Sequence, residues 1–146
     1  MRKKVVDKLN QFLEGNYMAI HAYEKYINHC QDAELKHILY QFQQDHKQHA
    51  QMITDRIQSF GGIPINHLGL KGTIIEWIKN LTEKTTLDTH IVKDALAGEA
   101  RGIEVSQKIL KDDLDIESKQ LVEKILSHDQ QHVNVLKKLL QQMDRS

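Results

Sequence analysis

The 146-residue chain contains little cysteine, proline or aromatic residue, and it has no excess charge of either sign. Because Cys30 is the single cysteine, an intrachain disulfide and a cysteine-based zinc site are excluded. Pro64 is the single proline, so the strongest helix breaker is missing from nearly the whole chain. Twenty basic residues balance twenty acidic ones, which argues against a nucleic-acid partner, because nucleic-acid binders usually carry a basic bias.

Long apolar runs and a secretory leader are also missing. The basic N-terminal residues are followed by Val5-Val6-Asp7-Lys8 rather than by an apolar stretch of signal-peptide length. No run approaches the roughly 18 apolar residues needed to span a membrane. We therefore expect a cytoplasmic protein with no membrane partner, built as a single domain over residues 1–146.

Apolar residues recur at spacings of three and four, which predicts long helices. The expected helices cover about residues 3–29, 32–60, 88–111 and 115–143, with Asp32 and Asp115 as N-caps. Gly61-Gly62 and Pro64 end the second helix. Within residues 61–87, a short amphipathic helix is expected at 73–84, packed across the bundle or against a partner subunit. Two hairpins (3–60 and 88–143) joined by a long crossover are typical of the ferritin-like four-helix bundle, so the predicted class is all-α.

An internal repeat supports this organisation. Shifted by 83 positions, residues 13–57 align with residues 96–140 without a gap, and nine of the 45 positions are identical. The repeat superposes the two expected caps, Asp32 and Asp115. It predicts that a pseudo-twofold axis relates the two hairpins.

Polar residues interrupt each apolar stripe near its middle, and the repeat places these interruptions at one level of the bundle. They are Asn16, His46, His49, Glu99, Asp129 and His132. Burying them without partners would cost roughly 1–3 kcal/mol for each neutral group and more for each charge. A bound metal ion would explain the whole group, since imidazole and carboxylate are metal ligands. A polar network without metal is the alternative.

Five further residues lie near these interruptions. Tyr23 could donate to a ligand, while Asp45 and His128 could orient ligands. Glu14 would join the site only if the first helix were rotated. His21 is expected at the surface.

Several segments resemble the ferritin-like superfamily. The first helix contains Ala19-Ile20-His21-Ala22-Tyr23, which is similar to the first helix of bacterioferritins around its ligand Glu and its Tyr. The chain is closer still to small bacterial ferritin-like proteins of unassigned function. They share the layout Gly15-Asn16-Tyr17-Met18-Ala19-Ile20, then Gln44-Asp45-His46-Lys47-Gln48-His49-Ala50, then Gly61-Gly62-Ile63-Pro64.

The resemblance implies a metal site of the di-iron pattern found in bacterioferritins and rubrerythrins. Glu99, His49 and His132 match that pattern in residue type. His46 and Asp129 occupy the places of the two bridging Glu residues, and Asn16 occupies the place of a terminal Glu. With two carboxylates where the pattern has four, a mononuclear site is also consistent with the sequence. The implied cofactor is iron, with manganese or zinc as alternatives. Haem is not expected, because Lys47 follows His46 where bacterioferritin has its haem-ligating Met.

These observations favour a metal-binding protein that oxidises Fe(II) or reacts with oxygen or peroxide in stress protection. Whether it is an enzyme stays open. The alternative is a metal-free bundle that acts as a stress- or spore-associated structural or binding protein, with a partner surface around Trp77. An iron-storage cage is a weaker hypothesis, because little sequence follows the fourth helix to form a fifth. A homodimer is one assembly consistent with the sequence, which leaves the oligomeric state open.

Overall fold

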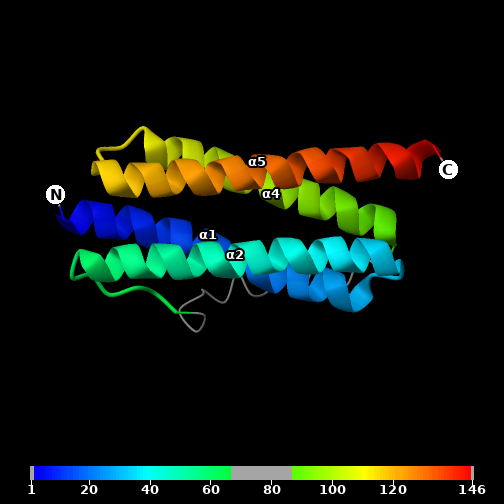
Figure 1. Cartoon of the computed structure of the whole chain (residues 1–146), viewed down its shortest axis with the longest axis horizontal. Helices are drawn as coiled ribbons and strands as arrows, with labels where there is room; N and C mark the ends of the chain where they lie inside the picture. The colour runs from blue at the N-terminus through cyan, green and yellow to red at the C-terminus, as the bar shows by residue number, and fades with distance from the viewer. Residues whose placement is uncertain (1, 67–86, 146) are drawn as a thin grey trace.

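The computed structural model describes residues 2–66 and 87–145, and in them the chain forms four long helices. They are α1 (Arg2–His29), α2 (Ala33–Ser59), α4 (Asp88–Leu110) and α5 (Ile116–Arg145). α1 packs on α2 and α4, and α5 packs on α4 and α2. Figure 1 shows the two hairpins, α1–α2 and α4–α5, lying side by side with their axes nearly aligned. The predicted all-α bundle of two hairpins is therefore confirmed, whereas the helix expected at 73–84 and Trp77 lie outside the described residues.

The helix ends follow the expected capping chemistry. Asp32 accepts a hydrogen bond from the backbone N–H of Leu35 at 2.8 Å, and Asp115 accepts one from that of Ser118 at 3.1 Å. Both predicted N-caps are thus confirmed. After α2, Gly61 adopts a φ of 72°, a left-handed conformation that favours glycine.

Arg56 links the end of α2 to the start of α5. Its guanidinium donates to Asp115, to Glu117 and to the Ser118 hydroxyl. Burial by itself would raise the pKa of Asp115, but the hydrogen bonds from Ser118 and the charge of Arg56 lower that pKa below its ordinary value. The second hairpin is therefore held against the first at this end of the bundle.

Two apolar clusters fill the interior, with a polar layer between them. One cluster includes Leu9, Ile53 and Val122, and the other includes Leu39 and Leu136. The six predicted interruptions are at most 5% exposed: Asn16, His46, His49, Glu99, Asp129 and His132. Burial of the apolar side chains stabilises each end by about 1.5–3 kcal/mol for every large residue.

The buried face of α4 includes small as well as large apolar residues. Ala95 and Ile109 are buried, whereas their neighbours Leu96 and Leu110 are only partly buried. Val92, Glu99 and Ser106, spaced by seven residues, are buried along the same face of the helix.

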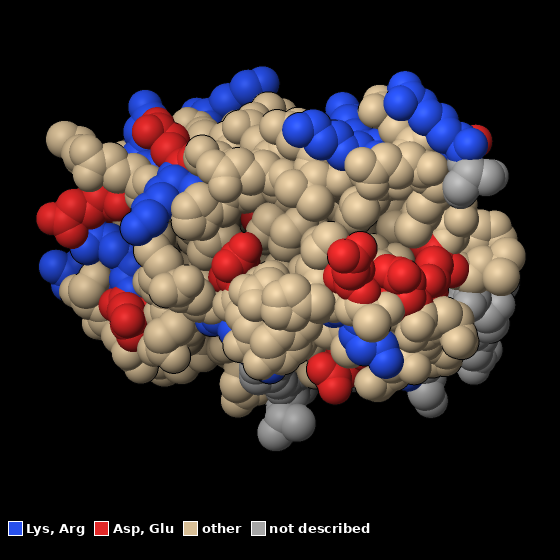
Figure 2. Space-filling model, turned by 45° about the vertical axis from the view of Figure 1, so that its right-hand side comes forward, with Lys and Arg blue, Asp and Glu red and all other residues tan. Residues whose placement is uncertain are grey.

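The surface carries charges of both signs. On the face shown in Figure 2, basic side chains lie mainly along the upper edge and at the left, and acidic ones lie at the left and across the middle. Among the described residues, no helix is long and apolar enough to cross a membrane.

Gly15 and Gly62 give a matched test of this packing. A Cβ atom added at Gly15 would meet nothing within 4 Å, so Gly15→Ala should stabilise the fold by about 0.5–1 kcal/mol. A Cβ atom at Gly62 would lie 2.7 Å from a methyl carbon of Val6, so Gly62→Ala should destabilise it by about 1–3 kcal/mol. Urea denaturation measures both changes, and the same sign for both variants would contradict the packing described.

Candidate metal centre

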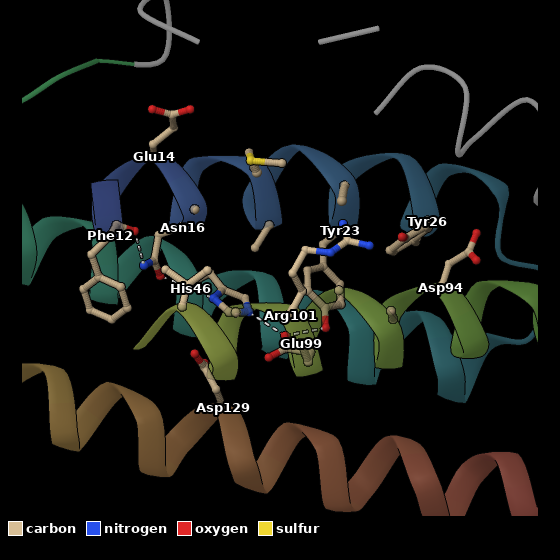
Figure 3. Close-up of a pocket in the computed structure, with 18 of the residues that line it drawn as sticks. Phe12, Glu14, Asn16, Tyr23, Tyr26, His46, Asp94, Glu99, Arg101 and Asp129 are labelled. Carbon is tan, nitrogen blue, oxygen red and sulfur yellow. Dashed lines mark hydrogen bonds and ion pairs between the residues drawn. The ribbon is translucent and has the colours of Figure 1, made fainter. Parts of the chain in front are cut away.

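All four helices contribute to the polar layer. Asn16 comes from α1, His46 from α2, Glu99 from α4, and Asp129 and His132 from α5. Asp129 and His132 are three residues apart, so they share one face of their helix. Figure 3 shows His46, Glu99 and Asp129 converging on one point from three helices. Each of His46, Glu99, Asp129 and His132 offers one ligand atom within 4.8 Å of the others, and all four side chains are buried. We call these four residues the central cluster.

Glu99 is the hub of the central cluster. Its Oε1 accepts hydrogen bonds from His46 Nε2 at 2.6 Å, from the Tyr23 hydroxyl at 2.7 Å and from His132 Nδ1 at 3.2 Å. Burial would raise the pKa of Glu99, but the charge of His46 and the hydrogen bonds from both histidines hold it well below its usual range. Glu99 is therefore an anion, and its bonds are charge-assisted.

Both imidazoles of the central cluster have an oxygen acceptor at each ring nitrogen. His132 Nε2 donates to Asp45 at 2.8 Å, and His46 Nδ1 lies 3.5 Å from Asn16 Oδ1. Burial lowers the pKa of each histidine, but Glu99 outweighs it, and both pKa values are raised. In this structure protons thus occupy the lone pairs that a metal ion would use.

Aromatic rings hold the two imidazoles in place. The ring of Phe42 stacks on His132 with 4.0 Å between centroids, and that of Tyr23 stacks on His46 at 5.6 Å. An aromatic face attracts a cation as well as packing against it. Both histidines are therefore oriented toward Glu99.

Asp129 differs from the rest of the central cluster, because one of its oxygens has no partner. Oδ1 accepts no hydrogen bond and lies 4.0 Å from His132 Nδ1. Burial raises the pKa of Asp129 to about 7. A buried oxygen without a partner is costly, and a cation beside it would remove that cost. The residues present therefore fit a metal ion, with two imidazoles and two carboxylates as donors.

His49 lies beside the central cluster but outside it. Its Nε2 faces His128 Nδ1 at 2.9 Å, while its Nδ1 has no partner. Burial, together with the charges of His46 and His128, lowers the pKa of His49 to about 4, so its ring is neutral. Of the six predicted ligands, the structure thus brings four together. Asn16 contacts His46, and the ring centroid of His49 lies 6.0 Å from that of His46.

Of the residues around the central cluster, some make the contacts that the sequence suggested and others do not. Tyr23 and Asp45 hydrogen-bond to members of the central cluster, as the sequence suggested. Glu14 points away from the cluster in Figure 3. Gln43 was missed, although it is 2% exposed and donates to the carbonyl of Ile20. The only sequence feature that could have indicated its burial is its position directly after Phe42, which lies on the apolar face of the helix.

A family model described as a domain of unknown function, DUF2383, matches residues 4–112. The chain belongs to this family. The match covers α1, α2 and α4 but ends before α5, so Asp129 and His132 lie beyond the part that the family model describes. Comparison with curated proteins gives no match.

Several solved structures share the fold at low sequence identity. The bacterioferritin-related protein of Bacteroides fragilis, a dodecameric thioferritin, has a TM-score of 0.84 at 20% identity, over 99% of this chain and 89% of that one. Rhodobacter capsulatus bacterioferritin has a TM-score of 0.80 at 22% identity, over 98% and 87%. A two-domain protein of Anabaena variabilis with a ferritin-like domain has 0.81 at 18%, over 98% and 40%. This DUF2383 chain therefore has the ferritin-like fold.

Removing the charge of Glu99 should destabilise the metal-free protein. Glu99→Gln keeps the side-chain shape but leaves His46 and His132 without their shared anion, so we expect a loss of about 3–5 kcal/mol at neutral pH. Urea denaturation in the presence of a chelator measures the loss. Glu104→Gln changes an exposed residue of the same helix and should stay within about 0.5 kcal/mol of the wild type. Equal stabilities of the two variants would contradict the role assigned to Glu99.

The stability lost in Glu99→Gln should depend on pH. The raised pKa values of His46 and His132 contribute stability that is complete below about pH 6.5, the unfolded value, and is lost as the pH rises through the folded values. Because Glu99 raises both values, the destabilisation by Glu99→Gln should be smaller at about pH 9 than at about pH 6. Denaturation curves at both pH values provide the test, and a constant or growing loss would contradict it.

Proposed function

We propose that the central cluster holds a single divalent transition metal ion, iron(II) in the first place. The observation that carries this proposal is the unpartnered Asp129 oxygen, buried within ligand distance of two imidazoles and a second carboxylate. A mixed set of imidazole and carboxylate donors suits Fe²⁺, and it also accepts Mn²⁺ or Zn²⁺. The likeness to bacterioferritin, whose solved structure is described as having a metal-free dinuclear site and a haem iron, supports a metal site at this place in the bundle.

The charge of the central cluster favours one ion over two. With both carboxyl groups ionised, Glu99 and Asp129 supply two negative charges, which balance one divalent cation and leave a second uncompensated in a buried site. His46 stands where the family resemblance has a bridging carboxylate, and an imidazole cannot bridge two ions in the same way. We therefore assign His46, Glu99, Asp129 and His132 as ligands, with His49 and Asn16 supporting them.

A bound iron ion would supply one-electron redox chemistry toward oxygen or peroxide. The protein's own residues would release protons on metal binding and would hold the ligands in position. His46 and His132 must each give up a ring proton to become ligands, and Asp45 accepts a hydrogen bond from the far nitrogen of His132, which sets its orientation. Tyr23 donates to Glu99 and keeps its own proton, because burial and then the charge of Glu99 raise its pKa well above the ordinary value.

A metal-free structural role is the second candidate, and one observation favours it. Glu99 and His132 already have charge-assisted hydrogen bonds inside the protein, so much of the central cluster is stable without an ion. In that case the polar layer would serve to align the four helices at one level.

Metal titration distinguishes these two functions. We expect anaerobic Fe(II) or Co(II) to bind at about one ion per chain and to release protons, because both imidazoles are protonated beforehand. Affinity should therefore increase with pH. Calorimetry in two buffers of different ionisation enthalpy, together with elemental analysis of untagged protein, measures both quantities.

Variants identify the ligands. His132→Gln and Asp129→Asn should weaken binding by about 100-fold or more, and Tyr23→Phe by about tenfold. His37→Gln replaces an exposed histidine and should leave binding unchanged, and His49→Gln should retain one ion per chain. A folded wild-type protein that binds no ion would support the metal-free role instead.

A further inference from the structure

A groove of about 280 Å³ lies between α1 and α4 and ends at the central cluster. Figure 3 shows side chains that line it. The small side chains in its two walls leave space between the helices: Gly15, Ala19, Ala22, Ala95, Gly98 and Gly102. The groove therefore connects the outside of the bundle with the proposed metal site.

Packing does not explain the glycines in these walls. A Cβ atom built on Gly15, Gly98 or Gly102 would meet no atom within 4 Å. All three lie inside helices, where glycine is less favourable than alanine. A larger side chain would fit the fold and would narrow the groove that these glycines line, so the groove stays open at the expense of helix stability.

The inner end of the groove is polar, and one of its acceptor oxygens has no donor. His46, Glu99 and Asp129 line it, and Asp129 is only 5% exposed while its Oδ1 accepts no hydrogen bond. The side walls are mainly apolar and include Phe12, Met18 and Val105. An occupant that matches this arrangement has an apolar body and a single donor group at its inner end.

The size of the groove limits the occupant further. An apolar cavity of roughly 150 Å³ in another protein holds one benzene molecule. The present volume suits a molecule of about ten non-hydrogen atoms by the same scale. A hydrated cation is a poor match for these walls, because an apolar passage cannot replace its water ligands.

We propose that the groove between α1 and α4 binds a small, mostly apolar organic molecule that carries one hydroxyl or amine group, and that molecules of this class are the substrates of the centre. The binding follows from the groove itself. The role as substrate rests on the metal site proposed above.

The first experiment measures binding without metal. 4-Ethylphenol and ethylbenzene are titrated into chelator-treated full-length protein and followed by calorimetry and by NMR shifts. 4-Ethylphenol should bind about tenfold more tightly than ethylbenzene, because its hydroxyl can donate to Asp129. Asp129→Ala should remove this difference and leave both molecules with similar affinity.

A matched pair of variants locates the binding. Gly98→Leu fills the groove and should lower the affinity for 4-ethylphenol by about tenfold or more. Ala97→Leu adds the same side chain one position earlier, on an exposed residue that does not line the groove, and should change the affinity less than twofold. Absence of binding to the wild type, which would follow if water alone or another part of the chain fills the groove in solution, overturns the proposal. Equal effects of the two variants also overturn it.

The second experiment tests the link to the metal. In Co(II)-loaded protein, 4-ethylphenol should shift the visible absorption spectrum of the wild type and of Ala97→Leu, but not that of Gly98→Leu. Binding without such a shift overturns the substrate role and leaves the groove as a binding site. Failure to load Co(II) contradicts the metal site alone, since binding in the first experiment needs no metal.

Discussion

The buried carboxylate of Glu99 is the constraint around which the polar layer is organised. A charge in the interior of a helical bundle is tolerated only if nearby groups compensate it and satisfy its lone pairs. His46, His132 and Tyr23 do so from three directions, and each of them is in turn held by a further contact. The two apolar clusters keep water away from the layer along the bundle axis, which strengthens its interactions, while the groove between α1 and α4 reaches it from the side.

The repeat explains how one carboxylate comes to be surrounded in this way. Each hairpin carries polar residues at equivalent positions, so folding the hairpins together superposes two half-sites in the middle of the bundle. The halves are not chemically equal, since Asn16 corresponds to Glu99 and His46 corresponds to Asp129. This asymmetry reduces the carboxylates to two, because an amide (Asn16) and an imidazole (His46) stand where a symmetric site would have acids. The proposal of a single ion agrees with that reduction.

The central cluster has two different sides, one packed against other side chains and one open to the groove. Three of the four proposed ligands line the inner end of the groove, so a bound ion and a bound organic molecule would lie next to each other. The remaining ligand, His132, is turned toward Asp45 and Phe42 instead. One side of the cluster is therefore rigidly packed, while the other opens between two helices lined with small residues.

Much of this architecture was determined by the sequence alone, because helical periodicity, caps and breakers act over a few residues. The four helices, the caps at Asp32 and Asp115, and the burial of six polar residues at one level all follow from local patterns. Only the tertiary structure decided which of the six meet. Helix rotation and side-chain rotamers turn His49 toward His128, and they turn Asp45 across to His132 although it directly precedes His46. The groove was likewise invisible in the sequence, since small residues form an opening only when two distant helices bring them face to face.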